Sequence, residues 1–439
     1  MHARCLLPFS FYETRCIEAT VRWLSRFLKS KDIMTRSTRW AAIWISGCLS
    51  YAACGTPAVA QSPLTQSPVA QTSLATTELI GQVRLPGSVS DRSGLVGLLE
   101  TNTPIDAFGG LSAIDYTGRD DRYLVLSDRG AGDGAASFPC RFHEVTLRVE
   151  PQSKTIAFQL KETRLLSDGV GTQLTGSLSQ LKEWKSEQRC PSYDPEGIRC
   201  VSDSTVVISD EYGPHLDLFR RDGRMQSSIR LPSRFGLSDR RVPPMLEGAF
   251  TNRGLEGVAV TPDRQWVVAA MQGPLVQDGR IEKNKCFGIW TRWYAQNLQT
   301  GQGVEWVYPL ADESTGVSEV LAIDAKRFLV LERDSNAGVD AKIKRIYVAD
   351  ATAASDVGQI NSLKSGLPTN VQPIGKQLLI DLLAPEVGLN GENAPEKPEG
   401  IAWGPRLEDG RRLLMICFDN DFEPEKETIF LAFAVSGLD

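Results

Sequence analysis

Acidic residues recur at the two ends of a repeated pair of short apolar segments. The clearest copy runs from Asp194-Pro195-Glu196-Gly197 to Ser209-Asp210, and four other copies share this arrangement. Clustered carboxylates repel one another unless a cation binds, and Ca²⁺, followed by Mg²⁺, is the cation best suited to such oxygen ligands. The pattern therefore predicts a divalent-metal site. Its expected ligands are Asp128, Glu196, Asp210, Glu256, Glu319, Glu399 and Asp419.

A structural explanation competes with the metal site for any single copy. A glycine after the acid is typical of a tight strand entry, and an acid at a strand end often caps a turn. Turn chemistry does not require acids at both ends of copy after copy, so we favour the metal site for the whole set. Within it, Glu196, Glu256 and Asp210 are the candidates for holding or activating a water molecule.

Basic residues accompany the acids in four of the copies. They are Arg129, Arg253, Arg333 and Lys397. Each could simply pair with its neighbouring acid. Alternatively, they face the same site and hold a small anionic substrate such as a phosphate ester, since guanidinium groups and metal ions together suit phosphoryl chemistry.

Other catalytic arrangements have little support. Beyond residue 60 the only histidines are His143 and His215, and the Gly-x-Ser-x-Gly motif of nucleophile-elbow hydrolases does not occur. His215 follows a candidate acid and could act as a general base or an imidazole ligand, although such a residue is more often a loop histidine. We keep His215 as a candidate catalytic residue beside Glu196, Glu256 and Asp210.

The elements that must position these residues are predicted to be β-hairpins. Short alternating apolar runs separated by Gly, Asp, Asn and Pro are typical of an all-β domain. In an antiparallel hairpin, the start of one strand and the end of the next lie at the same sheet edge, so the acids of each copy share a rim. Five copies with leftover strands at both ends predict a β-propeller of six blades, whereas a β-sandwich would not explain the repeat.

The two ends of the chain are expected to close this ring. Residues 79–85 and 428–435 are apolar runs that could share a blade and so hide their edges. Short helical insertions are expected at 177–188 and 359–367. The propeller is predicted to be one domain, residues 77–439.

The N-terminal region predicts export. Within residues 1–60, basic Arg36 and Arg39 precede an apolar run that is too short to span a bilayer permanently, and Ala58-Val59-Ala60 is typical of a signal cleavage site. We expect Met34 to be the true start. Alternatively, Cys48 ends a lipobox-like sequence and carries a lipid anchor. Residues 61–76 are rich in Ser, Thr, Gln and Pro and are expected to form a disordered linker.

Composition excludes some functions. The chain has 439 residues and a formal charge of −6, which argues against binding of nucleic acid or an anionic membrane. We expect an exported, periplasmic or extracellular monomer without a transmembrane helix. Loop cysteines of an exported protein could form one disulfide, with the pairing open among Cys140, Cys190 and Cys286.

Several of these motifs, in this order, resemble one exported protein family over roughly residues 105–425. They are Leu124–Gly130, Asp194-Pro195-Glu196-Gly197, Arg253-Gly254-Leu255-Glu256-Gly257, Leu329–Asp334 and Pro398-Glu399-Gly400-Ile401. The resemblance is to the family described as having esterase-like activity of phytase, related to the β-propeller phytases. It implies a phytase-like propeller and a calcium-assisted phosphoesterase. The substrate-binding lysines and arginines of those phytases are not matched position by position here.

Three functional hypotheses follow. The first is an exported, metal-assisted hydrolase of a phosphate ester or related ester. The second is a metal-dependent, lactonase-like propeller hydrolase, for which a neutral substrate makes the arginines dispensable. The third is a non-catalytic binding or scaffold propeller of the cell envelope, in which the rim acids are structural.

Overall fold

The structure, a computed structural model, describes residues 75–183, 189–237, 247–250, 252–283 and 285–438. The expected signal sequence, the candidate anchor Cys48 and almost all of the expected linker lie outside these residues. The compact unit that contains the described residues extends from Ala70 to Asp439. None of the described helices is long and apolar enough to cross a membrane.

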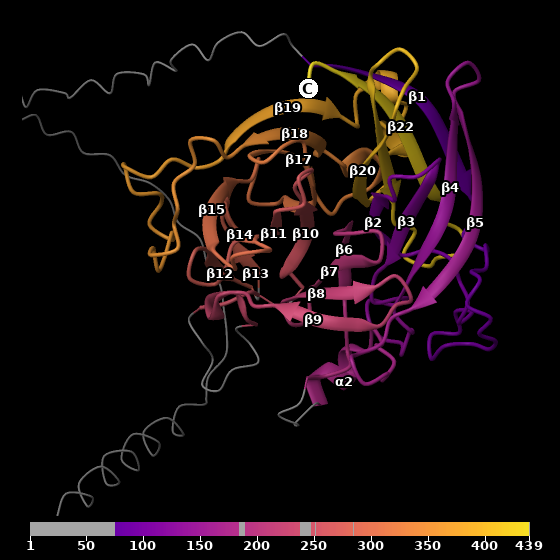
Figure 1. The fold of residues 1–439 in the computed structure, drawn as a ribbon, viewed down its shortest axis with the longest axis horizontal. Helices are drawn as coiled ribbons and strands as arrows, with labels where there is room; N and C mark the ends of the chain where they lie inside the picture. Colours follow the sequence, from indigo (N-terminus) through magenta and orange to yellow (C-terminus); the bar gives the residue numbers. More distant parts are fainter. Residues whose placement is uncertain (1–74, 184–188, 238–246, 251, 284, 439) are drawn as a thin grey trace, which may run out of the picture. The chain divides into compact units, whose positions relative to one another are not determined.

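Four sheets of four antiparallel strands follow one another along the chain, the first of them joined through one residue pair to a fifth sheet, and Figure 1 shows them arranged around a centre. The first contains β2 (Leu111–Tyr116), β3 (Arg122–Ser127), β4 (Arg141–Glu150) and β5 (Thr155–Leu165). The second contains β6 (Pro195–Cys200), β7 (Thr205–Asp210), β8 (His215–Arg220) and β9 (Met225–Ile229). The third contains β10 (Leu255–Val260), β11 (Trp266–Met271), β14 (Trp290–Asn297) and β15 (Gly303–Pro309). The fourth contains β16 (Gly316–Ala322), β17 (Arg327–Arg333), β18 (Lys344–Asp350) and β19 (Gly375–Asp381).

The fifth sheet joins the two ends of the described chain. It contains β20 (Pro398–Arg406), β21 (Arg412–Phe418), β22 (Thr428–Ser436) and β1 (Thr76–Leu85). β1 pairs antiparallel with β22 from Thr76 opposite Ser436 to Leu85 opposite Thr428. The expected pairing of the two terminal runs is therefore confirmed. One parallel residue pair, Gln82 opposite Thr155, also links β1 to β5.

The protein is a β-propeller, but the expected count of six blades is not confirmed. The described residues form five blades, and their innermost strands β2, β6, β10, β16 and β20 contact one another in sequence until β20 meets β2. The difference arises because the terminal runs do not form an additional blade. Instead, they supply the two outer strands of the blade that the hairpin β20–β21 begins.

Glycine follows the acid in three copies because neighbouring inner strands approach closely there. A Cβ atom on Gly257 would lie 2.7 Å from the Val320 nitrogen of the next blade. On Gly400 it would lie 2.7 Å from the Ile114 nitrogen. The recurring glycine therefore belongs to the packing of the ring.

The hydrophobic core consists mainly of five clusters, one between each pair of adjacent blades. Successive residues of a strand face opposite sides, so each blade supplies side chains to both neighbours. In the first blade, Leu124 packs towards Ile198 of the second blade, whereas Val125 packs towards Met415 of the fifth. The alternating apolar pattern of the strands is explained by this two-sided burial.

Short elements lie in the loops between blades and in loops between strands of one blade. They are α2 (Leu178–Glu183), the hairpin of β12 (Arg280–Glu282) and β13 (Lys285–Phe287), and the 3₁₀ turns η1 (Ser233–Phe235), η2 (Gly338–Asp340), η3 (Pro385–Val387) and η4 (Gly391–Asn393). α2 lies in the first expected helical insertion. The helix expected at 359–367 is wrong, because this segment consists of turns and irregular backbone. Its apolar residues Ile360 and Leu363 pack on Val307 instead.

No disulfide joins Cys140, Cys190 and Cys286. Cys140 and Cys286 are both free, so none of the three possible pairs forms. Cys140 is buried between the first two blades, where its thiol donates to the Tyr193 carbonyl at 3.3 Å. Cys286 is buried in the β12–β13 hairpin, with its thiol 3.7 Å from the Leu275 carbonyl oxygen. The expected disulfide fails because these thiols are packed in separate parts of the fold.

Candidate functional site

A cavity of about 980 Å³ opens at one end of the ring of inner strands. In each blade the pairing of the first two strands shifts at one extra residue of the inner strand, which is a β-bulge. A bulge bends its strand and redirects a side chain. The bulged residues all line the cavity, and they are Ser112, Glu196, Glu256, Ser318 and Glu399.

The second strand of each blade contributes another lining residue at its end. These residues are Asp128, Glu211, Gln272, Arg333 and Asp419. The backbone N–H groups of Asp128, Glu211, Gln272 and Asp419 donate to carbonyls just before the inner strand, so the position is equivalent from blade to blade. Each blade thus contributes these two side chains to the cavity lining, as the shared rim predicted.

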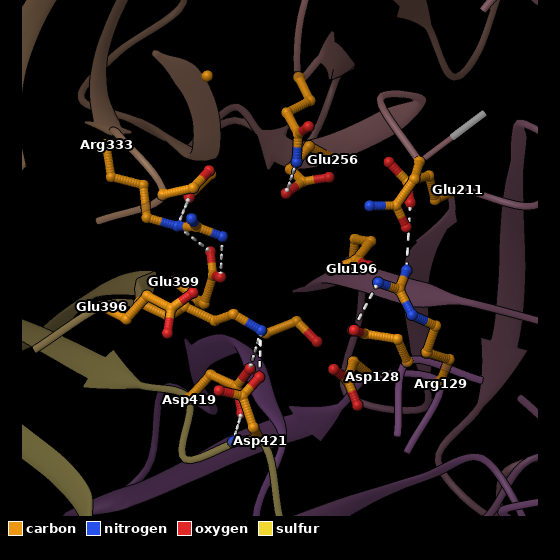
Figure 2. Close-up of a pocket in the computed structure, with 18 of the residues that line it drawn as sticks. Asp128, Arg129, Glu196, Glu211, Glu256, Arg333, Glu396, Glu399, Asp419 and Asp421 are labelled. Atoms are coloured by element: carbon orange, nitrogen blue, oxygen red, sulfur yellow. Dashed lines mark hydrogen bonds and ion pairs between the residues drawn. The ribbon is translucent and has the colours of Figure 1, made fainter. Parts of the chain in front are cut away.

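The acids of the second and third blades form the first half of the site, which we call the acid-rich half. It contains Glu196, Glu211 and Glu256, which line the cavity (Figure 2), and the buried Asp194 next to Glu196 and Glu211. Oxygen atoms of Asp194, Glu196 and Glu211 all lie within 4.8 Å of one another. Arg129 forms an ion pair with Asp194, and its Nη1 lies 3.4 Å from Glu211 Oε2. One guanidinium therefore contacts two of the three clustered carboxylates.

The clustering changes the protonation of these acids. Burial, followed by the charges of Asp194 and Glu256, holds the pKa of Glu196 well above its usual value. Burial and the charge of Asp194 raise the pKa of Glu211 to about 7. Each additional negative charge is unfavourable here, because it is buried and lies close to other carboxylates. A bound cation would offset both the cost of burying these charges and their mutual repulsion.

Glu256 presents a carboxylate oxygen that has no partner. Gln272 Nε2 donates to Glu256 Oε1 at 2.8 Å, and no hydrogen-bond partner in the described residues reaches Oε2. The residue is only 3% exposed. A buried oxygen without a partner at the wall of a polar cavity is a natural contact for a cation, a water molecule or a substrate.

The fourth and fifth blades form the second half, which we call the paired half. Arg333 binds Glu399 through Nε at 3.2 Å and also through Nη2, and its Nε lies 3.0 Å from Ser318 Oγ. Lys397 contacts Asp419 at 3.2 Å and forms a closer ion pair with Asp421. Figure 2 shows Arg333 and Glu399 across the opening from Glu211. In this half each acid has a basic partner.

Glu319 lies outside the cavity lining, further along the inner strand. The bulged residue of its blade is Ser318, so Glu319 takes the position that Gly197, Gly257 and Gly400 occupy elsewhere. Its carboxylate accepts from the Val258 and Val320 nitrogens and pairs with Arg199 Nη2 at 3.0 Å. Burial raises the pKa of Glu319 to about 8.

Arg199 occupies the axis of the ring beside Glu319. Its guanidinium donates to the carbonyls of Ile114, Ile198, Val320 and Ile401, which come from four blades. Each of these carbonyls belongs to the second residue after the bulge. The side chain is 3% exposed. Arg199 therefore fills the channel below the cavity and satisfies carbonyls that face the axis.

Asp210 and His215 also lie outside the cavity lining. Asp210 accepts from the backbone nitrogens of Asp194 and Tyr212 at 2.9 and 3.1 Å. Its other oxygen lies 2.7 Å from His215 Nδ1. The two candidates thus contact each other, but the neighbouring Glu211 is the residue that faces the cavity.

All four predicted basic residues line the cavity, and each already interacts with another part of the protein. Arg253 bonds to Gln272 Oε1 and to the Thr315 carbonyl, at 3.2 and 3.0 Å. Arg129, Arg333 and Lys397 are ion-paired as described above. The structure brings these four together with Asp128, Glu196, Glu256, Glu399 and Asp419.

Sequence reasoning did not select Asp194, Glu211 or Asp421 as site residues. Asp194 and Glu211 belong to the clearest copy, where Asp194 lies two positions before the selected Glu196 and Glu211 directly follows the selected Asp210. Asp421 follows Asp419 by two residues and pairs with both Lys397 and Lys426. Its position depends on a turn after β21 that the repeat pattern does not predict.

The acid-rich half offers a suitable donor set for a hard divalent cation. Asp194, Glu196 and Glu211 supply clustered oxygens, and the buried Glu256 Oε2 lacks a partner. Carboxylate oxygens are the ligands that Ca²⁺ prefers, and it tolerates irregular geometry better than Mg²⁺ does. The residues present therefore fit such an ion.

Comparison with known proteins gives distant relatives. The chain is 24% identical over 360 residues to an "Uncharacterized secreted protein" of Arthroderma benhamiae, covering 65% of this chain and 69% of that protein. Solved structures that match include streptogramin B lyase, with 12% identity, TM-score 0.32 and coverage of 83% of this chain and 99% of the other. The Dos1 propeller matches with 10% identity, TM-score 0.29 and coverage of 76% and 68%.

These structural scores are too low to carry a functional argument. The family comparison is stronger, because its model matches residues 106–422, which include all five hairpins and every bulged residue. The chain belongs to the phytase-like family described as having esterase-like activity of phytase.

Proposed function

We propose that this protein is an exported, metal-assisted hydrolase of a phosphate ester or related ester, acting in the cavity at the end of the propeller. The observation that carries the proposal is the cluster of Asp194, Glu196 and Glu211 beside the unpartnered Oε2 of Glu256. Family membership supports hydrolysis, and the relative described as secreted supports export.

In this proposal the two halves of the site have different tasks. Asp194, Glu196 and Glu211 would hold the cation, with Asp128 near the boundary between the halves. Bound Ca²⁺ would supply Lewis-acid polarisation of the ester and charge neutralisation. Arg333 and Lys397 steady the anionic group from the opposite side, after exchanging part of their contact with Glu399 and Asp419.

Glu256 is the proposed acceptor of the water proton. Burial, followed by the charges of Glu211 and Glu399, holds the pKa of Glu256 well above its usual value, so its carboxylate is a stronger base than an exposed one. The water oxygen forms a bond to phosphorus as the bond from phosphorus to the ester oxygen breaks. The water proton passes to Glu256, and the departing oxygen is protonated from solvent.

Calcium-dependent turnover tests the proposal. The purified protein is assayed with p-nitrophenyl phosphate and inositol hexakisphosphate, with Ca²⁺, with a chelator, and after Ca²⁺ is restored. We expect activity that chelation removes and Ca²⁺ restores. Glu196→Gln and Glu256→Gln should each lose about 100-fold or more in kcat/KM. Glu162→Gln, on the exposed surface of β5, is the matched control. Activity that survives both chelation and Glu256→Gln contradicts the proposal.

One observation favours a second candidate, a metal-dependent lactonase-like hydrolase. Arg129, Arg333 and Lys397 are all engaged by acids, which leaves less positive charge for an anionic substrate. A lactone or carboxylic ester does not need that charge. If Arg333→Met and Lys397→Met leave turnover of a neutral ester unchanged while phosphate esters are not hydrolysed, this candidate replaces the first. No turnover of any ester with Ca²⁺ supports a binding or scaffold propeller.

A further inference from the structure

Gln272 differs in chemical type from its equivalents in the other blades. At the end of the second strand the other blades carry charged residues, namely Asp128, Glu211, Arg333 and Asp419. Gln272 is a neutral amide that makes two hydrogen bonds. Its Nε2 donates to Glu256 Oε1 at 2.8 Å, and its Oε1 accepts from Arg253 Nε at 3.2 Å.

The chemistry of Arg253 determines the orientation of this amide. A guanidinium only donates hydrogen bonds, so the amide oxygen of Gln272 must face Arg253. The amide NH₂ group must then face Glu256, where it can only donate. Arg253 is in turn held by the Thr315 carbonyl at 3.0 Å. The series from Thr315 to Glu256 therefore has one consistent set of donors and acceptors.

Two glycines make room for these side chains. A Cβ atom on Gly316 would lie 2.8 Å from Gln272 Cγ and 3.3 Å from Arg253 Nη2. A Cβ atom on Gly273 would lie 3.1 Å from Arg253 Nε. Neither glycine is among those with a positive φ, so backbone conformation does not account for them. Space for the Arg253–Gln272 pair does.

We propose that Arg253 and Gln272 are positioning residues, which fix the Glu256 carboxyl so that Oε1 is occupied and Oε2 is left without a partner in the described residues. This assigns Arg253 a role other than the substrate binding expected from sequence. The inference rests on the proposed function for its consequence in catalysis, but the orientation of Glu256 is a property of the protein without substrate. A side chain held in one orientation before reaction avoids the cost of ordering it during reaction.

The direct test compares crystal structures of the metal-free wild type, Gln272→Met and Arg253→Met. We expect one orientation of the Glu256 carboxyl in the wild type and a rotated or multiple orientation in both variants. Gln296→Met, on β14 of the same blade and outside the cavity lining, is the matched control and should leave Glu256 unchanged. An unchanged Glu256 in Gln272→Met overturns the inference.

A variant with a smaller structural change tests the inference if Gln272→Met or Arg253→Met fails to fold. Gly316→Ala removes no hydrogen-bonding group, and the added methyl displaces Gln272 by a few tenths of an ångström. We expect a smaller rotation of Glu256 in the same direction. A displaced Gln272 with Glu256 unmoved overturns the inference.

Kinetics separate positioning from a general loss of structure. Gln272→Met should lower kcat about 10-fold, the equivalent of one hydrogen bond to a charged group, with KM and calorimetric Ca²⁺ affinity changed less than about 2-fold. The double variant with Arg253→Met should be no worse than the more severe single variant, because the two residues act in series. In a Glu256→Gln background, Gln272→Met should have no further effect on kcat.

Independent, additive losses of kcat in the double variants overturn the inference. Absence of turnover by the wild type instead defeats the proposed function, and the comparison of crystal structures then decides this inference.

Discussion

The two halves of the cavity carry similar residue types but differ in how their charges are balanced. In the acid-rich half, Asp194, Glu196 and Glu211 lie together, and Arg129 contacts two of them, Asp194 and Glu211. In the paired half, Arg333 binds Glu399, and Lys397 and Lys426 bind Asp421. The acid-rich half therefore has more acids than basic partners, and the paired half has a basic partner for each acid.

This difference indicates in which half the binding of a cation is more favourable. In the acid-rich half a divalent ion would neutralise carboxylates that already repel one another. In the paired half the same ion would have to compete with ammonium and guanidinium groups in contact with the acids. The comparison predicts metal binding on one side and anion binding, by exchange of ion-pair partners, on the other.

Removal of the arginine from each half should give the largest difference. Arg129→Met leaves the buried Asp194 and Glu211 without their basic partner, which should cost about 3 to 5 kcal/mol in a chelator. Ca²⁺ should recover much of this loss by replacing the missing charge. Arg333→Met should lose a similar amount that Ca²⁺ does not recover. Thermal and urea unfolding, each with and without Ca²⁺, measure both effects. Equal recovery in the two variants would remove the distinction between the halves.

Neutralisation of one acid in each half should give the second-largest difference between the halves, measured as Ca²⁺ affinity. Glu196→Gln removes a proposed ligand and should weaken Ca²⁺ binding roughly 100-fold. Glu399 already pairs with Arg333, so Glu399→Gln should change Ca²⁺ affinity less than about 5-fold. Isothermal titration calorimetry with CaCl₂ gives both affinities. If Glu399→Gln has the larger effect, the cation belongs on the side that we assign to the anion.

The pH dependence of Ca²⁺ binding follows from the protonation of the acid-rich half. Burial and Asp194 raise the pKa of Glu211 to about 7, and the cation needs the deprotonated form. Between pH 7.5 and 5.5 the protonation of Glu211 alone should weaken Ca²⁺ binding roughly 20-fold. This pH dependence should be smaller in Glu211→Gln. Calorimetric titrations at several pH values measure it, and a pH-independent affinity would exclude Glu211 as a ligand.

The stability of the metal-free protein should change with pH in the opposite direction. The folded pKa of Glu211, about 7, is higher than that of the unfolded chain, so the folded state binds more protons from about pH 4.5 to 7. The contribution of this group to stability is therefore greatest below that range and is lost as the pH rises through 7. Thermal midpoints of the wild type and Glu211→Gln in a chelator, compared at pH 5 and 7.5, isolate this contribution. A wild type that gains stability relative to Glu211→Gln as the pH rises would contradict it.

Much of the fold was predictable because each blade repeats one hairpin. The acid-flanked segments correspond to β2–β3, β6–β7, β10–β11, β16–β17 and β20–β21, and the terminal strands pair as expected. The blade number was not predictable in the same way. Five hairpins with leftover strands could form five or six blades, and the choice depends on long-range pairing of β1 with β22, which no local pattern specifies.

In two of the blades the selected acid was one residue away from the side chain that lines the cavity. A shift of one position in a strand turns the side chain to the other face. In the fourth copy Glu319 was selected, but the bulge places Ser318 in the cavity and directs Glu319 to Arg199. In the second copy Asp210 was selected, but Glu211 lines the cavity. The position of a bulge depends on pairing between strands, so composition alone does not reveal it.

The smallest expected effect concerns His215, which lies outside both halves. Its Nδ1 contacts Asp210, whose carboxylate is 1% exposed and also accepts two backbone N–H groups, so the pair has a structural task. His215→Gln should therefore change kcat/KM for any substrate less than about 2-fold and lower stability by roughly 1 kcal/mol. Steady-state kinetics and urea unfolding measure the two quantities. A loss of 100-fold or more in kcat with unchanged stability would instead give His215 the catalytic role expected from sequence, and the chemistry would then extend beyond the two halves compared here, to the outer side of the second blade.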